Sequence, residues 1–464
     1  MRREKLLFGI SVLLVSAFII ALPAGVLAQA QNDKITVATI AGFYTDWLKE
    51  ISEDFEEETG TEVEIIGIDF SNLYEKEAME MASGTGAYDI ITLESTWLPE
   101  WAANKWLVNL TPRIENTPTE ELDLDKVSPA LRSLNSWNGE VYGLPYYTYH
   151  MGQFYREDLF SHPVERENFR EEYGYPLHPP YTMRQFKDVA EFFTREKGEK
   201  LKGETLDKPF YGVGLMAGRY PHIQDEVMTF LWGMGGQWLE PTEKGLKVTA
   251  NSETAVRALE YYVSLLDYAP PQATNAAYDE VISQLQDGLI AMTGPMYLDQ
   301  WANAVMTEEE VPGADVEAKQ VPLMHGYTGG FTFGISAGSK NKEAAWEFLK
   351  WEASKEAQIK FAKGGGTTTR MDIMQDPEVV NEELVNKTGH YPVLYESLRL
   401  HEDFIEQYGL FQTMTAGKIY QELMIACSKA ASGEQSPEKA LDSLQTTITN
   451  ILKRYGRPDI LVEE

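Results

Sequence analysis

The chain has 464 residues, of which 72 are Asp or Glu and 40 are Lys or Arg, so its formal net charge at pH 7 is −32. Such a surface repels phosphate groups, which argues against nucleic acid or an anionic membrane surface as a partner. The single cysteine, Cys427, excludes an intramolecular disulfide, and 43% hydrophobic content in a chain of this length is enough for a large core without one.

The first 30 residues have the pattern of a secretory signal peptide. Basic side chains at positions 2, 3 and 5 precede the apolar run 6–22, and Ala28-Gln29-Ala30 has the small-x-small pattern of a cleavage site. The alternative is a retained membrane anchor, because the apolar run approaches the length of a spanning helix. No cysteine lies at the cleavage point for lipid attachment. We therefore expect a cleaved signal peptide and a mature chain that is periplasmic or secreted.

The mature chain opens with strand and helix patterns in alternation. They occur in the order 34–40 (strand), 47–55 (helix, ended by Gly60), 63–68 (strand), 73–82 (helix) and 89–93 (strand). This order predicts a parallel sheet covered by helices. Ligands of such sheets bind in the loops beyond the carboxyl ends of the strands, here residues 41–46 and 94–97.

Helix patterns dominate the middle of the chain, and a strand pattern returns later. The turn and strand around 138–147 contain Pro145, which limits further pairing. The next expected elements are helices at 184–193 and 225–232, a helix capped by Asn251 or Ser252, a strand at 331–335, a helix at 342–361 and a last helix starting at Ser436-Pro437. A chain that leaves one α/β lobe and returns to it predicts two lobes, several crossings and a cleft.

Six segments, spread over nearly the whole mature chain, carry a resemblance to a known family. They are 55–63, Ser83-Gly-Thr-Gly-Ala-Tyr-Asp-Ile90, Gly139-Glu-Val-Tyr-Gly-Leu-Pro-Tyr146 with 154–160, Gly233-Met-Gly-Gly236, Gln286-Asp-Gly-Leu-Ile-Ala-Met-Thr-Gly-Pro295 and Gly334-Ile-Ser-Ala-Gly-Ser-Lys-Asn-Lys-Glu-Ala-Ala-Trp-Glu-Phe-Leu349. In this order they resemble the family 1 extracellular solute-binding proteins of ABC importers, which include maltose- and trehalose-binding proteins.

The resemblance implies an α/β fold of the two-lobe periplasmic binding protein type (type II), with parallel-sheet lobes joined by hinge crossings. The N-terminal lobe would comprise residues 31–145 and 323–361, and the C-terminal lobe residues 146–322 and 362–464. Such lobes close on a small ligand, and the ABC permease subunits recognise the closed form. We therefore expect a monomer that is not an enzyme and has no cofactor. The seven histidines show no metal-binding spacing, so we expect no metal.

Sugars present apolar C–H faces and hydroxyl groups, so a sugar site combines aromatic rings with hydrogen-bonding side chains. Of the 24 Tyr and 10 Trp, many lie in expected loops, and Tyr146 and Tyr149 flank Tyr147 at the first crossing. From these loops and from the resemblance, the candidate ligand contacts are Tyr44, Glu94, Trp97, Tyr147, Gln224, Asp225, Met296, Tyr297, Gly330, Phe331, Arg370 and Tyr420.

Three of these candidates have competing interpretations. Arg370 ends the segment 364–370, which resembles a family loop with a ligand-contacting arginine and makes it the strongest polar candidate; the alternative is a surface residue. Asp225 has the alternative role of a helix cap. Met296 stands where many sugar binders have a stacking tryptophan, so Tyr297 or Trp301 would stack instead.

Other ligands and one enzymatic alternative stay open at this point. A polyol, a phosphorylated polyol or a polyamine would replace the mono- or oligosaccharide as the solute. The segment 334–338 matches the nucleophile elbow of α/β-hydrolases, with Ser336, Asp372 and either His390 or His401 in triad order. An elbow serine stands at a tight turn directly before a helix, whereas Ser336 is followed by Ala-Gly-Ser-Lys-Asn. We therefore favour a binding protein.

Overall fold

The computed structural model describes residues 34–243, 245–322, 325–400, 410, 413–455 and 461–463. The expected signal peptide and His401 lie outside these ranges. Across the described ranges, no helix combines the length and the apolar character needed to cross a membrane.

The N-terminal part has the predicted alternation of strands and helices. Its elements are β1 (Lys34–Ile40), α1 (Phe43–Thr59), β2 (Glu62–Ile68), α2 (Phe70–Ser83) and β3 (Ile90–Glu94), and β1 pairs in parallel with both other strands. Gly60 has a left-handed φ of 74° and its N–H donates to Glu56 O, so it ends α1 as predicted. The carboxyl ends of these strands therefore meet at one edge of the sheet.

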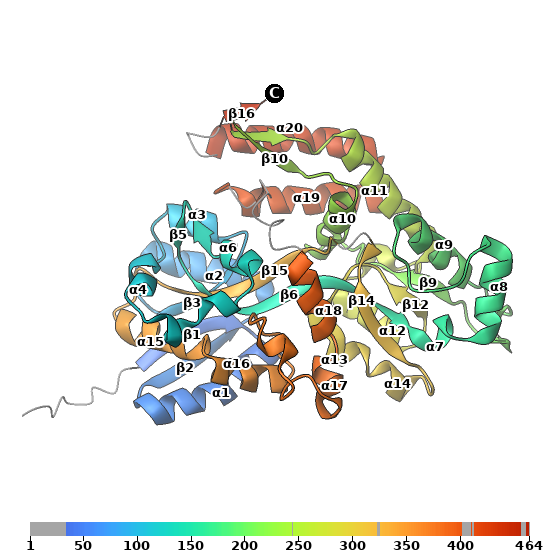
Figure 1. Ribbon diagram of the computed structural model, residues 1–464. Helices are drawn as coiled ribbons and strands as arrows, with labels where there is room; N and C mark the ends of the chain where they lie inside the picture. Colours follow the sequence, from blue (N-terminus) through green and yellow to red (C-terminus); the bar gives the residue numbers. More distant parts are fainter. Residues whose placement is uncertain are drawn as a thin grey trace, which may run out of the picture.

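One long strand, β6 (Leu144–Arg156), runs from the first lobe into the second. Its first half pairs antiparallel with β15 (Thr328–Ile335), and its second half pairs antiparallel with β14 (Val316–Gln320), β13 (Met296–Tyr297) and β12 (Ile290–Thr293). With β9 (Tyr211–Gly214) beside β12, nine strands form one sheet whose main order is β2-β1-β3-β15-β6-β12-β9 (Figure 1).

Parallel pairs occur in both lobes as expected, β1 with β2 and β3 in one and β12 with β9 in the other. The sheet as a whole is mixed, because β15 pairs antiparallel with β3 and β6, and β6 pairs antiparallel with β12. Pro145 disturbs the pairing locally. It lies opposite Thr332, next to an irregularity between Phe331 and Thr332 that accommodates the missing N–H.

Helices cover the sheet in both lobes, and those expected at 184–193, after Asn251 or Ser252 and at Ser436-Pro437 begin within one residue of the expected position. The helix expected at 225–232 begins earlier, at His222. The helices include α8 (Pro163–Tyr173), α9 (Met183–Phe193), α10 (His222–Gly233), α11 (Glu253–Leu265), α12 (Tyr278–Gln286), α18 (Tyr391–Leu400), α19 (Ala416–Ala431) and α20 (Pro437–Tyr455). Ser252 caps α11 by accepting a hydrogen bond from Ala255 N at 3.2 Å. In Figure 1, α19 and α20 lie together as one layer above the sheet.

The single helix expected at 342–361 is two helices. They are α15 (Lys342–Glu352) and α16 (Lys355–Lys363). Ser354 interrupts the run because its hydroxyl accepts from Ala357 N at 3.2 Å, which makes it the N-cap of α16.

Three crossings between the lobes are tied together around Thr148 on β6. The Thr148 N–H donates to Thr367 O at 3.2 Å, and its hydroxyl donates to Gly329 O at 3.0 Å. Thr369 Oγ1 donates to Pro145 O at 3.2 Å. These side chains are buried, so the hydrogen bonds are shielded from water. The lobe bounds that the resemblance implies change after residues 145, 322 and 361. These three positions lie in β6, shortly before β15 and shortly before residues 364–370.

Replacement of Glu352 by Gln tests a buried carboxyl beside this hinge. Glu352 is 2% exposed and accepts from Gln358 Nε2 at 2.8 Å, and burial raises its pKa to about 8. Between roughly pH 4.5 and 8 the folded protein therefore holds a proton that the unfolded chain has already released. The free energy of unfolding falls as pH rises through this window. Glu352→Gln should make that fall shallower by up to about 1.4 kcal/mol per pH unit in urea denaturation.

The control is Glu347→Gln on the same helix, which makes the same substitution at an exposed position. The Glu347→Gln slope should match that of the unmodified protein. A Glu352→Gln slope equal to both would contradict the assignment.

Candidate functional site

Tyrosines and carboxylates from distant elements meet at the junction of the two lobes. They come from α1, β3, β6, α10, β13, the 3₁₀ turn η4 (Leu298–Gln300), the residue before β15 and α19. The set, which we call the inter-lobe cluster, consists of Tyr44, Glu94, Tyr147, Tyr149, Asp225, Tyr297, Asp299, Tyr327 and Tyr420.

Glu94 is the last residue of β3, where the parallel strands end. It accepts from Thr96 N at 2.9 Å, from Ser95 Oγ at 3.0 Å and from Tyr149 Oη at 3.2 Å. Burial raises the pKa of Glu94, and these hydrogen bonds oppose the rise by stabilising the carboxylate. The site residue at this strand end is therefore an acidic acceptor held in place by its own turn.

Asp225 lies within α10 and accepts from two tyrosines. Tyr297 Oη donates to it at 2.6 Å, and Tyr420 Oη donates to its other oxygen. Because α10 begins at His222, Asp225 is not the helix cap, and that alternative interpretation is wrong. Burial raises the pKa of Asp225 to about 8, and the nearby charge of Glu94 adds to the rise.

Asp299 connects the C-terminal lobe to the N-terminal lobe. It accepts from Tyr147 Oη and from Gln300 Nε2 at 3.1 Å. Tyr44 on α1 donates to Tyr147 Oη at 2.6 Å and lies 3.4 Å from Asp299 Oδ2. Burial raises the pKa of Asp299 as well. Three carboxyl groups therefore face the lobe junction, each bound by hydroxyl groups.

Aromatic rings surround these carboxyl groups. Phe331 stacks on Tyr147 with ring centroids 5.8 Å apart, and Tyr149 meets Tyr297 edge-to-face at 5.5 Å. Trp97 stacks on Phe70 at 5.9 Å and is only partly buried. Rings beside hydrogen-bonding groups suit a ligand with C–H faces and hydroxyls.

Most sequence-predicted site residues lie in or beside the cluster. Tyr44, Glu94, Tyr147, Asp225, Tyr297 and Tyr420 belong to it, Phe331 and Trp97 contribute rings, and Gln224 Nε2 lies 3.5 Å from Asp225 Oδ1.

Three candidates and one substitute lie elsewhere. Met296 is buried in the core of the C-terminal lobe, because side chains alternate along β13 and only Tyr297 reaches the cluster. Gly330 lies in the sheet, where an added Cβ would come within 2.7 Å of Tyr147 O. Trp301 donates from its indole to Val385 O at 2.6 Å and is buried, so it is not the stacking partner.

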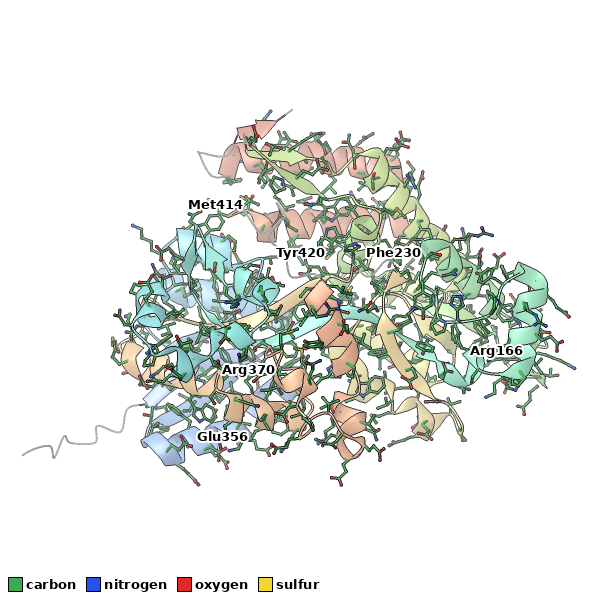
Figure 2. All side chains as sticks on the ribbon, viewed as in Figure 1. Arg166, Phe230, Glu356, Arg370, Met414 and Tyr420 are labelled. Carbon is green, nitrogen blue, oxygen red and sulfur yellow. The ribbon has the colours of Figure 1, made fainter. Side chains whose placement is uncertain are left out.

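Arg370 belongs to the hinge rather than to the cluster. Figure 2 shows it on the other side of β6 and β15 from Tyr420. Its side chain is 1% exposed and donates to Asp123 Oδ2 at 2.8 Å, to Asp372 Oδ1 at 3.1 Å and to Ala353 O at 3.4 Å. The arginine therefore ties residues 370–372 to the N-terminal lobe.

Asp299, Tyr327 and Phe70 were not among the sequence candidates. Asp299 follows Tyr297 by two residues, but it lies in the 3₁₀ turn η4 beyond the end of β13, so strand alternation does not predict its position. Tyr327 precedes a strand, and no neighbouring residue in the sequence identifies it as a site residue. Phe70 starts α2 and is 38% exposed, which the sequence does not reveal.

The residues of the hydrolase alternative have other partners. Ser336 is fully buried and its Oγ accepts from Gly338 N at 3.3 Å. Asp372 pairs with Arg370, and His390 Nε2 lies 3.3 Å from Thr367 Oγ1. The structure therefore does not assemble Ser336, Asp372 and His390 as a triad.

The family model for bacterial extracellular solute-binding proteins matches residues 38–359. The chain belongs to this family. A probable amino-acid ABC transporter periplasmic-binding protein of Sinorhizobium fredii is 22% identical over 441 residues, covering 92% of this chain and 90% of the relative. The mannitol-binding protein of Pseudomonas aeruginosa is 23% identical over 470 residues, covering 96% and 98%.

Solved structures agree with the two-lobe architecture. An ABC transporter solute-binding protein from Agrobacterium radiobacter K84, in complex with ribitol, has a TM-score of 0.71 and 22% identity. The match covers 90% of this chain and 98% of that chain. The similarity shows that the chain has the two-lobe fold of these binding proteins.

Replacement of Arg370 by Ala tests its place in the hinge. The change leaves the Asp123 and Asp372 carboxylates and Ala353 O without their donor, so the free energy of unfolding should fall by about 2–3 kcal/mol. Urea denaturation measures this loss. The control is Arg113→Ala, which breaks the surface pair with the 84% exposed Glu343 and should cost less than about 1 kcal/mol. Equal losses for the two variants would contradict the hinge role.

Proposed function

We propose that this protein captures a polyhydroxylated solute, a sugar or a polyol, between its two lobes and delivers it to the permease of an ABC importer. The observation that carries the proposal is the inter-lobe cluster, where six tyrosine hydroxyls and three carboxyl groups from both lobes bond to one another. Each ligand hydroxyl donates one hydrogen bond and accepts others, so it pairs with a carboxylate and a tyrosine at once.

Ligand entry would require the lobes to separate, which would break the hydrogen bonds between them. Tyr44 of α1 reaches Asp299 of the C-terminal lobe both directly and through Tyr147. Ligand hydroxyls would take the place of such contacts when the lobes close again. The hydrogen bonds around Thr148 lie beside this cluster and would form the hinge of the motion.

Relatives support a hydroxylated ligand. One curated relative is a mannitol-binding protein, and one structural neighbour was solved with ribitol. Another relative is described as a probable amino-acid transporter component. An amino acid or a phosphorylated polyol carries an anionic group that calls for Arg or Lys. Among the described residues, neither Lys nor Arg forms a hydrogen bond or ion pair with the cluster carboxylates, so the site disfavours both ligands.

The remaining sequence-based expectations complete the proposal. The N-terminal lobe would comprise residues 31–145 and 323–361 and the C-terminal lobe residues 146–322 and 362–464. After removal of residues 1–30, the mature chain would act in the periplasm as a monomer, without cofactor or metal. Its role would be binding and delivery, with no chemistry on the ligand.

Isothermal titration against a panel of sugars and polyols tests this function. At least one member should bind, and Asp225→Asn should weaken that binding by about tenfold or more. The amide nitrogen of Asn cannot accept a hydrogen bond, and a buried polar group left unpaired costs about 1–3 kcal/mol. The control is Asp267→Asn at an exposed position of the same lobe, which should bind like the unmodified protein. Binding of another solute class together with no binding of any sugar or polyol would contradict the proposal.

A further inference from the structure

The three carboxyl groups of the inter-lobe cluster are bonded to neutral donors. Glu94 is bound by Ser95, Thr96 and Tyr149, Asp225 by Tyr297 and Tyr420, and Asp299 by Tyr147 and Gln300. His222 lies 3.2 Å from Tyr297 Oη, but burial lowers its pKa to about 4, so it adds no positive charge at neutral pH. Neutral hydroxyls satisfy the hydrogen bonds but supply no positive charge, so burial raises the pKa of all three carboxyl groups, that of Asp225 to about 8.

Elsewhere in the C-terminal lobe, a largely buried carboxylate is paired with two basic side chains. Asp158 is bound by Arg156 Nε at 2.6 Å and by Lys202 Nζ at 2.8 Å. Buried acids without a basic partner have raised pKa values instead, as Glu226 does beside Asp225. The cluster carboxyl groups are of this second kind, and a cation brought by a ligand would stabilise their charged form as Arg156 and Lys202 stabilise that of Asp158.

Acceptors in the cluster also outnumber donors. Asp299 Oδ1 and Gln224 Oε1 are buried and have no hydrogen-bond partner among the described residues. Gln224 is fully buried, and its amide nitrogen lies 3.5 Å from Asp225 Oδ1. An ammonium group has three donors and no acceptor, whereas a hydroxyl brings an acceptor with every donor. The shortage of donors therefore favours an ammonium group.

Aromatic rings add to this preference. Tyr149 lies 5.5 Å from the rings of both Tyr297 and Phe331, and Tyr147 stacks on Phe331. Ring faces attract a cation, and the attraction is stronger where water is excluded.

We propose that the preferred ligand is a polyol or sugar that carries a protonated amine, with its ammonium group bound by the cluster carboxylates and Asp299 Oδ1 among its acceptors. This inference rests on the proposed function, because the hydroxyls of the ligand use the tyrosines and the remaining carboxylate oxygens. The amine adds the positive charge and the donors that the cluster lacks.

Matched ligand pairs test the inference by isothermal titration of the full mature protein at neutral pH. The pairs are D-glucitol with 1-amino-1-deoxy-D-glucitol and D-glucose with D-glucosamine, with N-acetyl-D-glucosamine as a neutral derivative and putrescine as an amine without hydroxyls. In at least one pair the amine should bind about tenfold or more tightly than its parent, because charge-assisted hydrogen bonds are roughly twice as strong as neutral ones. Acetylation should abolish the gain.

A variant locates the ammonium group. Asp299→Asn keeps the shape of the side chain and removes its charge, so it should weaken binding of the amine about tenfold more than it weakens binding of the neutral parent. The control is Asp267→Asn, which should change neither affinity, and thermal unfolding of both variants confirms that they are folded. Equal weakening of both members of a pair by Asp299→Asn would overturn the assignment of Asp299.

The possible results distinguish failure of this inference from failure of the proposed function. Parents that bind as tightly as their amines would overturn the inference and leave sugar or polyol capture standing. Putrescine that binds more tightly than every hydroxylated ligand would overturn both, because the site would then select a polyamine. Absence of binding by all of these compounds and by the wider sugar and polyol panel would also overturn both.

Discussion

The structure depends on β6, a strand of 13 residues that is shared by both lobes. At about 3.3 Å per residue it spans roughly 40 Å, enough to serve two sheets in succession. Its first half pairs with β15 and its second half with β14, β13 and β12, so strands of both lobes are hydrogen-bonded to it. The lobes are thereby joined by buried backbone hydrogen bonds rather than by a flexible linker.

The alternation of side chains along this strand also places the site. Tyr147 and Tyr149 are two residues apart and therefore project from the same face of β6. Tyr147 reaches Asp299 of one lobe and Tyr44 of the other, while Tyr149 reaches Glu94. Thr148, between them, faces the opposite side and bonds to the other crossings. The side chains that tie the crossings together and those that form the inter-lobe cluster therefore project from opposite faces of the same three residues.

Buried carboxyl groups at the lobe junction are costly for an isolated protein. Desolvation disfavours their charged form, and tyrosine hydroxyls recover only part of the lost hydration. Such groups remain useful in a binding protein because a ligand that supplies the missing donors satisfies them, and this contributes to the free energy of binding. Arg370, the base for which a ligand contact was predicted, is instead paired with Asp123 and Asp372, which keeps its positive charge in the hinge.

The sequence by itself determined the local elements and the family resemblance. Periodicity and caps located β1, α1, α11 and α20, since each depends on neighbours within a few residues, as Gly60 does at the end of α1. Loop position and residue type identified Glu94, Tyr147 and Asp225 as candidates. The motifs in order identified the family, which the match over residues 38–359 confirmed.

Only the tertiary structure decided which of these residues meet. Tyr44 and Asp299 are 255 positions apart, and Tyr420 and Asp225 are 195 apart, so no local pattern encodes their contact. The same holds for the mixed sheet, because the direction of β15 depends on the lobe from which the chain returns. It holds for Arg370 too, since its partner Asp123 lies 247 residues away. The chemistry of each side chain follows from its residue type, whereas the partners and the burial of that side chain depend on packing between distant segments.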